Sequence, residues 1–285
     1  MALTCALAWA VAVLLLRQLK SESAVALNLF KNTLAAILHT TTLFVIGGSF
    51  ARDRSAADWT MLVLSGVLGL ALADTLFLAG LRRIDASVAA VTDCIYSPAV
   101  VGLSVLFLGE QLGSGFIIGA PLVLLGLAAV VVPTKASRAL KVDRAGVLLA
   151  LAGVLTTAVA VIVAKPVLNR SGLIEATAVR LWAGSFALFA FETAFGRAKS
   201  ALALFRPQPA WKRAIPAALM GTYIAMLLWL GGIKYGTASR AAVLNQMGAI
   251  YVLVLSALVL KERPPLLRWI GAAVAVVGVM LVVAL

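Results

Sequence analysis

Long apolar stretches separated by short polar connections make up most of this chain. A helix that crosses a bilayer needs about 20 consecutive, mostly apolar residues. Ten segments meet this requirement, at 2–19, 25–47, 59–81, 86–108, 115–133, 145–164, 173–195, 214–233, 238–260 and 266–285. The stretches are continuously apolar rather than alternating, which favours helices over the strands of a membrane barrel. The pattern therefore predicts an all-α integral membrane protein with ten transmembrane helices.

The composition agrees with this prediction and excludes one class of partner. Of the 285 residues, 63% are hydrophobic and 12% are charged, which is about half the charged fraction of soluble domains. The formal net charge of +13 would suit a nucleic acid. However, the Lys and Arg residues lie scattered over the short connections, as in the cytoplasmic loops of membrane proteins. We therefore expect the lipid bilayer as the surroundings and no nucleic-acid partner.

The chain also repeats itself at a spacing of 152 residues. Residues 80–131 superpose on 232–283 without a gap, with identical residues at 18 of the 52 positions. Matching pairs include Ala86 and Ala238, Ser87 and Ser239, and Glu110 and Glu262. Each copy holds five spans, an odd number, so the two copies must enter the membrane in opposite orientations. We predict two inverted five-helix halves, 1–133 and 145–285, joined by a loop at 134–144, as in alternating-access transporters.

Positive charge is distributed unevenly between the two sides of the predicted bundle. The loops on the side of the N-terminus carry 6 Lys and Arg residues, among them Lys165, and the loops on the opposite side carry 16. By the positive-inside rule, the side with 16 lies in the cytoplasm and both termini lie outside.

Two related motifs, one near the end of each half, are similar to a known family. LFLGEQL followed by GAPLVLLGLAAVV, and LVLKERPP followed by GAAVAVVGVMLVV, resemble the closing segment of the EamA-type repeat of the drug/metabolite transporter (DMT) superfamily. Gln111 and Lys261 depart from that pattern, which usually has Arg and Gly there. The resemblance covers essentially the whole chain. It implies ten helices in inverted halves, export or exchange of small metabolites, and cytoplasmic termini, and this last point disagrees with the charge count.

Polar residues at two repeat-related positions predict a substrate or coupling-ion site within the bilayer. An ionisable residue at the bilayer centre costs about 2.5–3.5 kcal/mol on insertion scales, so it normally faces a cavity or a partner. Asp93 lies about one third of the way along its span, beside Tyr96, and its equivalent is Asn245, followed by Gln246. A carboxylate and amides would thus meet from related helices. The alternative is that Asp93 only pairs with a basic residue.

Other ionisable residues also lie within the predicted spans. Asp74 would either bind a coupling proton or form one half of a buried ion pair. Lys31 and Arg180 would either bind a substrate carboxylate or neutralise an aspartate, with pairing favoured for both. His39, the only histidine, has an unperturbed pKa of about 6.5 that suits a proton relay, although a packing role is favoured. The polar face of the second span comprises Asn28, Lys31, Asn32, His39 and Thr42.

Motifs for catalysis and ATP hydrolysis are absent from the sequence. It contains no HExxH, no Cys/His cluster with metal-ligand spacing and no P-loop, so we predict no catalytic residue, no metal and no cofactor. Glu110 and Glu262 lie in turns before helix starts, and we interpret them as helix caps. Four aromatic residues would pack within the spans or line a cavity: Trp9, Tyr223, Trp229 and Tyr251.

Inverted halves and buried polar groups favour a secondary active transporter that exports or exchanges small metabolites, with amino-acid-like solutes as the expected class. Alternating access would move this small-molecule substrate, with protons as the candidate coupling ion. The alternatives are a passive channel or facilitator and, with less support, a membrane-embedded enzyme. We expect a monomer, because the second half is supplied by the same chain, in the cytoplasmic (inner) membrane of a bacterium.

Overall fold

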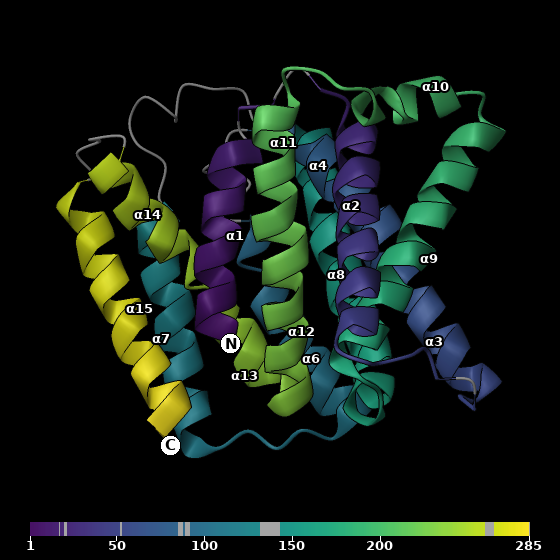
Figure 1. The fold of residues 1–285 in the computed structure, drawn as a ribbon. Helices are drawn as coiled ribbons and strands as arrows, with labels where there is room; N and C mark the ends of the chain where they lie inside the picture. Colours follow the sequence, from purple (N-terminus) through teal and green to yellow (C-terminus); the bar gives the residue numbers. More distant parts are fainter. Residues whose placement is uncertain are drawn as a thin grey trace.

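The chain folds into a bundle of long helices (Figure 1). The computed structural model describes residues 1–16, 18–19, 22–51, 53–84, 88, 92–131, 143–259 and 265–284. Within these ranges the regular elements are all helical. Seven helical stretches there are long and apolar enough to cross a membrane, judged by length and composition. Some of these stretches comprise two or three of the elements named below. The protein is therefore an all-helical, multi-pass membrane protein.

A helix occurs in each of the ten segments that the sequence predicts. Up to residue 131 the elements are α1 (Ala2–Leu16), α2 (Ala24–Val45), α3 (Ala56–Gly66), η1 (Val67–Ala73), α4 (Asp74–Leu81), α6 (Tyr96–Leu108) and α7 (Ser114–Val131). From residue 144 they are α8 (Arg144–Arg170), α9 (Leu173–Ala194), α10 (Ala198–Ala201), η3 (Ala203–Phe205), α11 (Trp211–Ala218), η4 (Leu219–Ile224), α12 (Ala225–Tyr235), α13 (Ala238–Asn245), α14 (Gly248–Val259) and α15 (Leu266–Ala284). The first and fourth segments give shorter apolar helices. α2 is less apolar because it contains Lys31, Asn32 and His39.

The predicted span 86–108 is interrupted rather than continuous, which corrects the sequence prediction. The described helical residues before the interruption end at Asp93, a turn follows, and α6 begins at Tyr96. Pro98 lies in the first turn of α6. Because proline has no N–H, Pro98 cannot donate to the carbonyl of Cys94, and the helix does not run through this point.

The predicted span 238–260 is interrupted at the equivalent place. α13 ends at Asn245 and α14 begins at Gly248. The backbone N–H groups of Gln246 and Met247 donate to carbonyls three residues back rather than four, which tightens the chain into a turn. The two interruptions are 152 residues apart, so the two copies of the repeat fold alike at this point.

Two further helices contain a π-helical turn, which the sequence analysis did not predict. η1 joins α3 to α4 and η4 joins α11 to α12, and the first residues of the two turns are 152 apart. At the end of η1, the N–H of Asp74 donates to the carbonyl of Gly69, five residues back. The Leu70 carbonyl, which Asp74 would reach in an α-helix, is therefore left for another donor. Such turns are rare and often lie at functional sites.

α7 and α15 run antiparallel and form the most extensive contact between described helices (Figure 1). A Cβ added at Gly126 would lie 2.5 Å from the carbonyl oxygen of Gly271, and one at Gly119 would lie 2.5 Å from that of Gly278. Glycine therefore allows the two backbones to approach closely. In the repeat Gly119 corresponds to Gly271 and Gly126 to Gly278, so the two contacts are reciprocal.

The first helix of each copy of the repeat packs against the other copy. α1 contacts α11, η4, α12, α13 and α14, whereas α8 contacts mainly α3, η1, α4 and α6. α2 and α9, which are equivalent in the repeat, pack against each other. The two copies are therefore interlocked, and the polar residues of α2, α4, α9 and α12 come from both.

α8 is longer than the predicted span 145–164, because it continues to Arg170. Lys165, expected in a loop, is therefore a buried residue of the helix. Its Nζ donates to the carbonyls of Ile233 and Gly236 at the end of α12. Carbonyls at a helix end have no partner within the helix. Lys165 thus ties α8 to α12 and is not one of the loop charges.

Candidate functional site

The two helix interruptions contact each other. Gln246, just after α13, donates from Nε2 to the backbone carbonyl of Asp93 at 3.0 Å. That carbonyl lies at the end of a helical segment, where carbonyls lack partners within the helix. Asn245, the repeat equivalent of Asp93, has a buried Oδ1 without a hydrogen-bond partner in the described ranges. Folding thus brings Gln246 to Asp93 and leaves polar groups at the interruption unused.

The side-chain carboxylate of Asp93 has no partner among the described residues. Their four ion pairs involve other carboxylates, and only the backbone of Asp93 accepts a hydrogen bond from another side chain. The alternative interpretation, in which Asp93 pairs with a basic residue, has no counterpart in this part of the chain. In the same ranges no group of three or more His, Cys, Asp or Glu residues could hold a metal ion. A half-buried carboxylate in this setting can bind a proton or an organic cation.

Tyr96, Trp229 and Arg180 form a chain of contacts beside the interruption. Tyr96 is buried as the first residue of α6, and its Oη accepts a hydrogen bond from Nε1 of Trp229 at 3.2 Å. The ring centroid of Trp229, in α12, lies 5.8 Å from Cζ of Arg180. This distance is within the range of a cation–π interaction. The sequence allows both packing and cavity lining for Trp229. In the structure Trp229 links α6 to α9.

Arg180, in α9, is one of the most deeply buried side chains of the protein, with 1% of its surface exposed. Its Nε, Nη1 and Nη2 atoms have no hydrogen-bond partner in the part of the chain that the structure describes. The negative charge of Asp74 acts on the guanidinium, but neither Asp74 nor the neutral Tyr96 forms a hydrogen bond or an ion pair with it. The pairing that the sequence favoured for Arg180 is therefore not found there.

Asp74 pairs with Lys31 instead. Nζ of Lys31 lies 2.5 Å from Oδ2 of Asp74 and 3.1 Å from Oδ1 of Asn32. The side chain of Lys31 is 8% exposed and that of Asp74 is 30% exposed. Of the two roles considered for Asp74, the ion pair is the one present in the structure, and Lys31 is the residue that neutralises it.

The π-helical turn η1 is held by the same polar face of α2. Nδ2 of Asn28 donates to the Leu70 carbonyl at 2.8 Å, and Nδ2 of Asn32 donates to it at 3.2 Å. Asn32 also donates to Oδ1 of Asn28 at 3.0 Å. The shared acceptor is the carbonyl that the π-helical geometry leaves free. The sequence pattern placed both asparagines on one face, but their acceptor was not predictable, because no residue pattern marked the π turn.

His39 is held by packing contacts. Its Nδ1 lies 2.8 Å from the carbonyl oxygen of Ala35, and its ring meets that of Tyr223 edge-on with the centroids 4.7 Å apart. Oη of Tyr223 is hydrogen-bonded to Oγ1 of Thr42 at 2.7 Å. Nε2 of His39 is buried without a partner in the described ranges. These contacts join α2 to η4 and agree with the packing role that the sequence favoured.

Glu110 caps a helix, although not the helix start beside which it lies in the sequence. Its Oε1 accepts from the N–H of Ala238 at 2.6 Å, and its Oε2 accepts from the N–H and Oγ of Ser239 at 3.1 and 2.6 Å. The capped helix is α13, in the second copy of the repeat. Oγ of Ser239 also bonds to Oγ of Ser104 at 2.6 Å. Glu110 is thus occupied by structural contacts, while the predicted cap at Glu262 lies outside the described residues.

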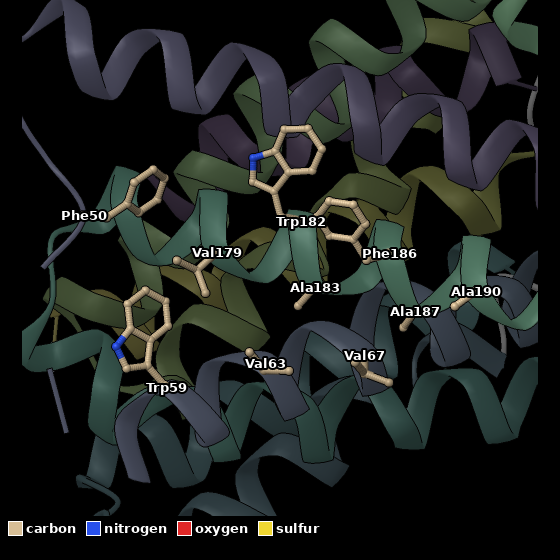
Figure 2. Close-up of a pocket in the computed structure, with 10 residues that line it drawn as sticks. All are labelled: Phe50, Trp59, Val63, Val67, Val179, Trp182, Ala183, Phe186, Ala187 and Ala190. Atoms are coloured by element: carbon tan, nitrogen blue, oxygen red, sulfur yellow. The ribbon is translucent and has the colours of Figure 1, made fainter. Parts of the chain in front are cut away.

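An apolar groove of about 570 Å³ lies between α3 and α9 (Figure 2), and these two helices lie at the edge of the bundle (Figure 1). Figure 2 shows Trp59 and Val63 of α3 on one side, and Trp182 and Phe186 of α9 on the other. Nε1 of Trp182 is already bonded to Thr40. The lining has no charged side chain, so this groove cannot neutralise an ionic substrate and is separate from the polar site.

Known proteins resemble the chain at three levels. The profile of the EamA-like transporter family matches residues 1–132 and 144–284. A protein of Streptantibioticus cattleyicolor, named as a probable terminal-alkyne amino-acid exporter, is 27% identical over 263 residues, which cover 90% of this chain and 82% of that protein. Among solved proteins, a crystal structure that covers 98% of this chain and 94% of its own has a similar fold, with a TM-score of 0.80 and 18% sequence identity.

Proposed function

The chain belongs to the EamA-like transporter family, and we propose that it is a secondary active transporter that exports or exchanges a small, amino-acid-like metabolite. The family and the long apolar helices make it a membrane transporter. The mode of transport and the solute are the proposal. Its relative from S. cattleyicolor is named as an amino-acid exporter, which supports amino acids as the class of solute. We place the protein in the cytoplasmic membrane of a bacterium, and we expect it to act as a monomer.

Two inverted halves, 1–133 and 145–285, would supply alternating access, with α1, α2 and α6 completing ten spans. The antiparallel contact of α7 with α15 supports this architecture, because its glycine pairs are reciprocal in the repeat. A twofold axis in the membrane plane would produce such pairs. The helix interruptions and π turns recur at the same spacing. α1 and α8 each pack into the opposite half, so each moving unit would include one helix from the other half. Rocking of the two units would open the core to one side at a time.

The observation on which the proposal mainly rests is the unpaired Asp93 carboxylate at the contact between two interrupted helices. In secondary transporters, interrupted helices turn backbone polar groups and helix ends toward the substrate and the coupling ion. A carboxylate without a protein partner at such a point is available to a proton or to the ammonium group of an amino acid. Structural residues in the same core, such as Lys31 and Asp74, already have partners.

Counterflow in proteoliposomes tests this proposal. Vesicles are preloaded with unlabelled amino acids or metabolites, and uptake of the labelled solute is followed with and without an imposed pH gradient. We expect saturable counterflow of at least one solute by the native protein and its loss in Asp93→Asn, because the amide can neither ionise nor take up a proton. If Asp93 binds the coupling proton, the pH gradient should drive net flux in the native protein only.

Asp53→Asn is the matched control, because Asp53 is exposed in a connection between helices. This variant should transport at the native rate. Counterflow that survives Asp93→Asn would keep the carrier but remove Asp93 from the site. Fast solute flux without counterflow would identify a channel and refute the proposed mechanism.

A further inference from the structure

Arg180 places a positive charge in the core, and the described part of the protein gives it no counter-charge. The side chain is 1% exposed, and none of its three nitrogens has a hydrogen-bond partner there. A guanidinium has five N–H donors and stays protonated in proteins. Burial of such a group without partners is strongly unfavourable. A ligand that supplies the missing acceptors would remove this cost when it binds.

The neighbours of Arg180 orient its guanidinium without using its donors. The Trp229 ring, 5.8 Å from Cζ, offers only its π face. Gly69, in η1, contributes no side chain, and a Cβ there would lie 3.5 Å from Nη2 of Arg180. Asp74, whose charge acts on Arg180, is already held by Lys31 at 2.5 Å. The donors of Arg180 thus stay available while its position is fixed.

We propose that Arg180 binds the carboxylate group of the transported solute; this inference rests on the proposed transport function. A planar guanidinium can bind both oxygens of a carboxylate through two parallel hydrogen bonds. The charge of Lys31 is used by Asp74, so Arg180 offers one positive charge, which matches a monoanion. The anchor for the solute is therefore Arg180, a residue of α9 remote in sequence from Asp93.

The location of Arg180 relative to Asp93 fits an α-amino acid in particular. Arg180 contacts the ring of Trp229, which donates a hydrogen bond to Tyr96, three residues after Asp93, and both charged residues lack an ion-pair partner among the described residues. An α-amino acid has a carboxylate for Arg180 and an ammonium group for Asp93. Arg180 and Tyr96 are both buried, so the solute would reach them only when the halves rearrange, as alternating access requires.

Ligand analogues test this inference without altering the protein. Leucine, methionine and phenylalanine are each compared with the corresponding amide and with the amine that remains after decarboxylation. Binding to the full-length protein in detergent and counterflow in proteoliposomes are both measured. At least one amino acid should bind, and its two analogues should bind at least about 30-fold more weakly, because they leave Arg180 unpaired. Equal binding of an amino acid and its amide, or binding of none of the three amino acids, would overturn the inference.

Variants then assign the carboxylate preference to Arg180 itself. Arg180→Gln should lose the preference for the amino acid over its amide, and Arg180→Lys should keep part of it, because lysine retains the charge but not the planar fork. Arg213→Gln, at an exposed residue, is the matched control and should bind like the native protein. A folded Arg180→Gln variant that keeps the native preference would refute the inference. If that variant does not fold, unchanged preference in Arg180→Lys would refute it.

The two proposals fail in different ways. Binding that depends on the carboxylate and on Arg180, but without counterflow, would uphold Arg180 as the anchor and refute secondary transport. Counterflow that treats an amino acid and its amide alike would uphold transport and refute the role of Arg180.

Discussion

At the scale of single residues, the charged side chains of the core fall into two groups, those in an ion pair and those without one in the described ranges. Lys31 and Asp74 neutralise each other at 2.5 Å, whereas Asp93 and Arg180 have no ion-pair partner in the described ranges. A buried ion pair adds little stability over an apolar pair, but the loss of one partner leaves a costly charge behind. We therefore interpret Lys31 and Asp74 as structural residues and the two unpaired charges as groups used in transport.

Removal of one member of the Lys31–Asp74 pair should destabilise the protein more than removal of both. We expect Lys31→Met or Asp74→Asn to lower the free energy of unfolding by about 1–3 kcal/mol, because each leaves an unpaired polar or charged group. The double variant should recover part of this loss. The unfolding temperatures of these variants are compared with a thiol-reactive dye, because Cys5 is a buried free thiol that unfolding exposes to the dye.

Lys212→Met is the control for this pair, because Lys212 is exposed, and it should unfold like the native protein. A double variant whose destabilisation equals the sum of the two single variants would show that Lys31 and Asp74 are not coupled.

At the scale of elements, the irregular helices create the polar core. The π turn η1 leaves the Leu70 carbonyl free, and Asn28 and Asn32 bind it. The interruption before α6 leaves the Asp93 carbonyl free, and Gln246 binds it. Within a bilayer a freed backbone carbonyl must find a donor in the protein or in a water-filled cavity. Amide side chains provide this donor at both places, so the irregular helices are stable enough to present side chains to a solute.

Glu110 should matter for the stability of α13 and not for solute binding. Glu110→Ala removes the acceptor of two backbone N–H groups and one hydroxyl, and we expect it to lower the free energy of unfolding by about 1–3 kcal/mol. Glu110→Gln keeps one acceptor oxygen and should cost less. The exposed neighbour gives the control Gln111→Ala, expected to change stability by less than about 0.5 kcal/mol. A raised KM for counterflow in Glu110→Ala with unchanged unfolding would contradict the capping role.

At the scale of the whole molecule, the two copies of the repeat hold each other together. α1 and α8 each pack mainly against helices of the other copy, and α7 packs along α15 (Figure 1). Gly119, Gly126, Gly271 and Gly278 bring the backbones of α7 and α15 together. Because this contact joins helices that are equivalent in the repeat, we expect it to act as a fixed seam while other helix contacts change during transport.

Alanine at the seam should be destabilising, although alanine usually favours a helix. A Cβ at Gly126 would lie 2.5 Å from the carbonyl oxygen of Gly271, and one at Gly271 would lie 2.6 Å from that of Gly126. We expect Gly126→Ala or Gly271→Ala to cost about 1–3 kcal/mol through overpacking. Gly102→Ala is the control in α6, where a Cβ meets nothing within 4 Å, and it should be neutral or stabilise by up to about 1 kcal/mol. Equal unfolding temperatures of the seam and control variants would contradict this packing.

The helical, membrane-spanning character of the protein was determined by its sequence. A helix occurs in all ten predicted segments, because a continuous apolar run in lipid must satisfy its own backbone hydrogen bonds, and a helix does so within one segment. The family could likewise be recognised from motifs that each lie within a short stretch of sequence. The cap at Glu110 was predictable as a role, but the helix that it caps begins 128 residues away.

Only the tertiary structure decided which polar groups meet and which stay unpaired. Gln246 and Asp93 are 153 residues apart and Lys31 and Asp74 are 43 apart, so their contacts depend on which helix faces turn toward each other. Arg180 was expected to pair and does not do so within the described ranges. The physical reason is that the hydropathy of a segment, which decides whether it spans the lipid, is a property of that segment alone. The neutralisation of a charge depends instead on the distances between segments, and these are set only when the helices pack.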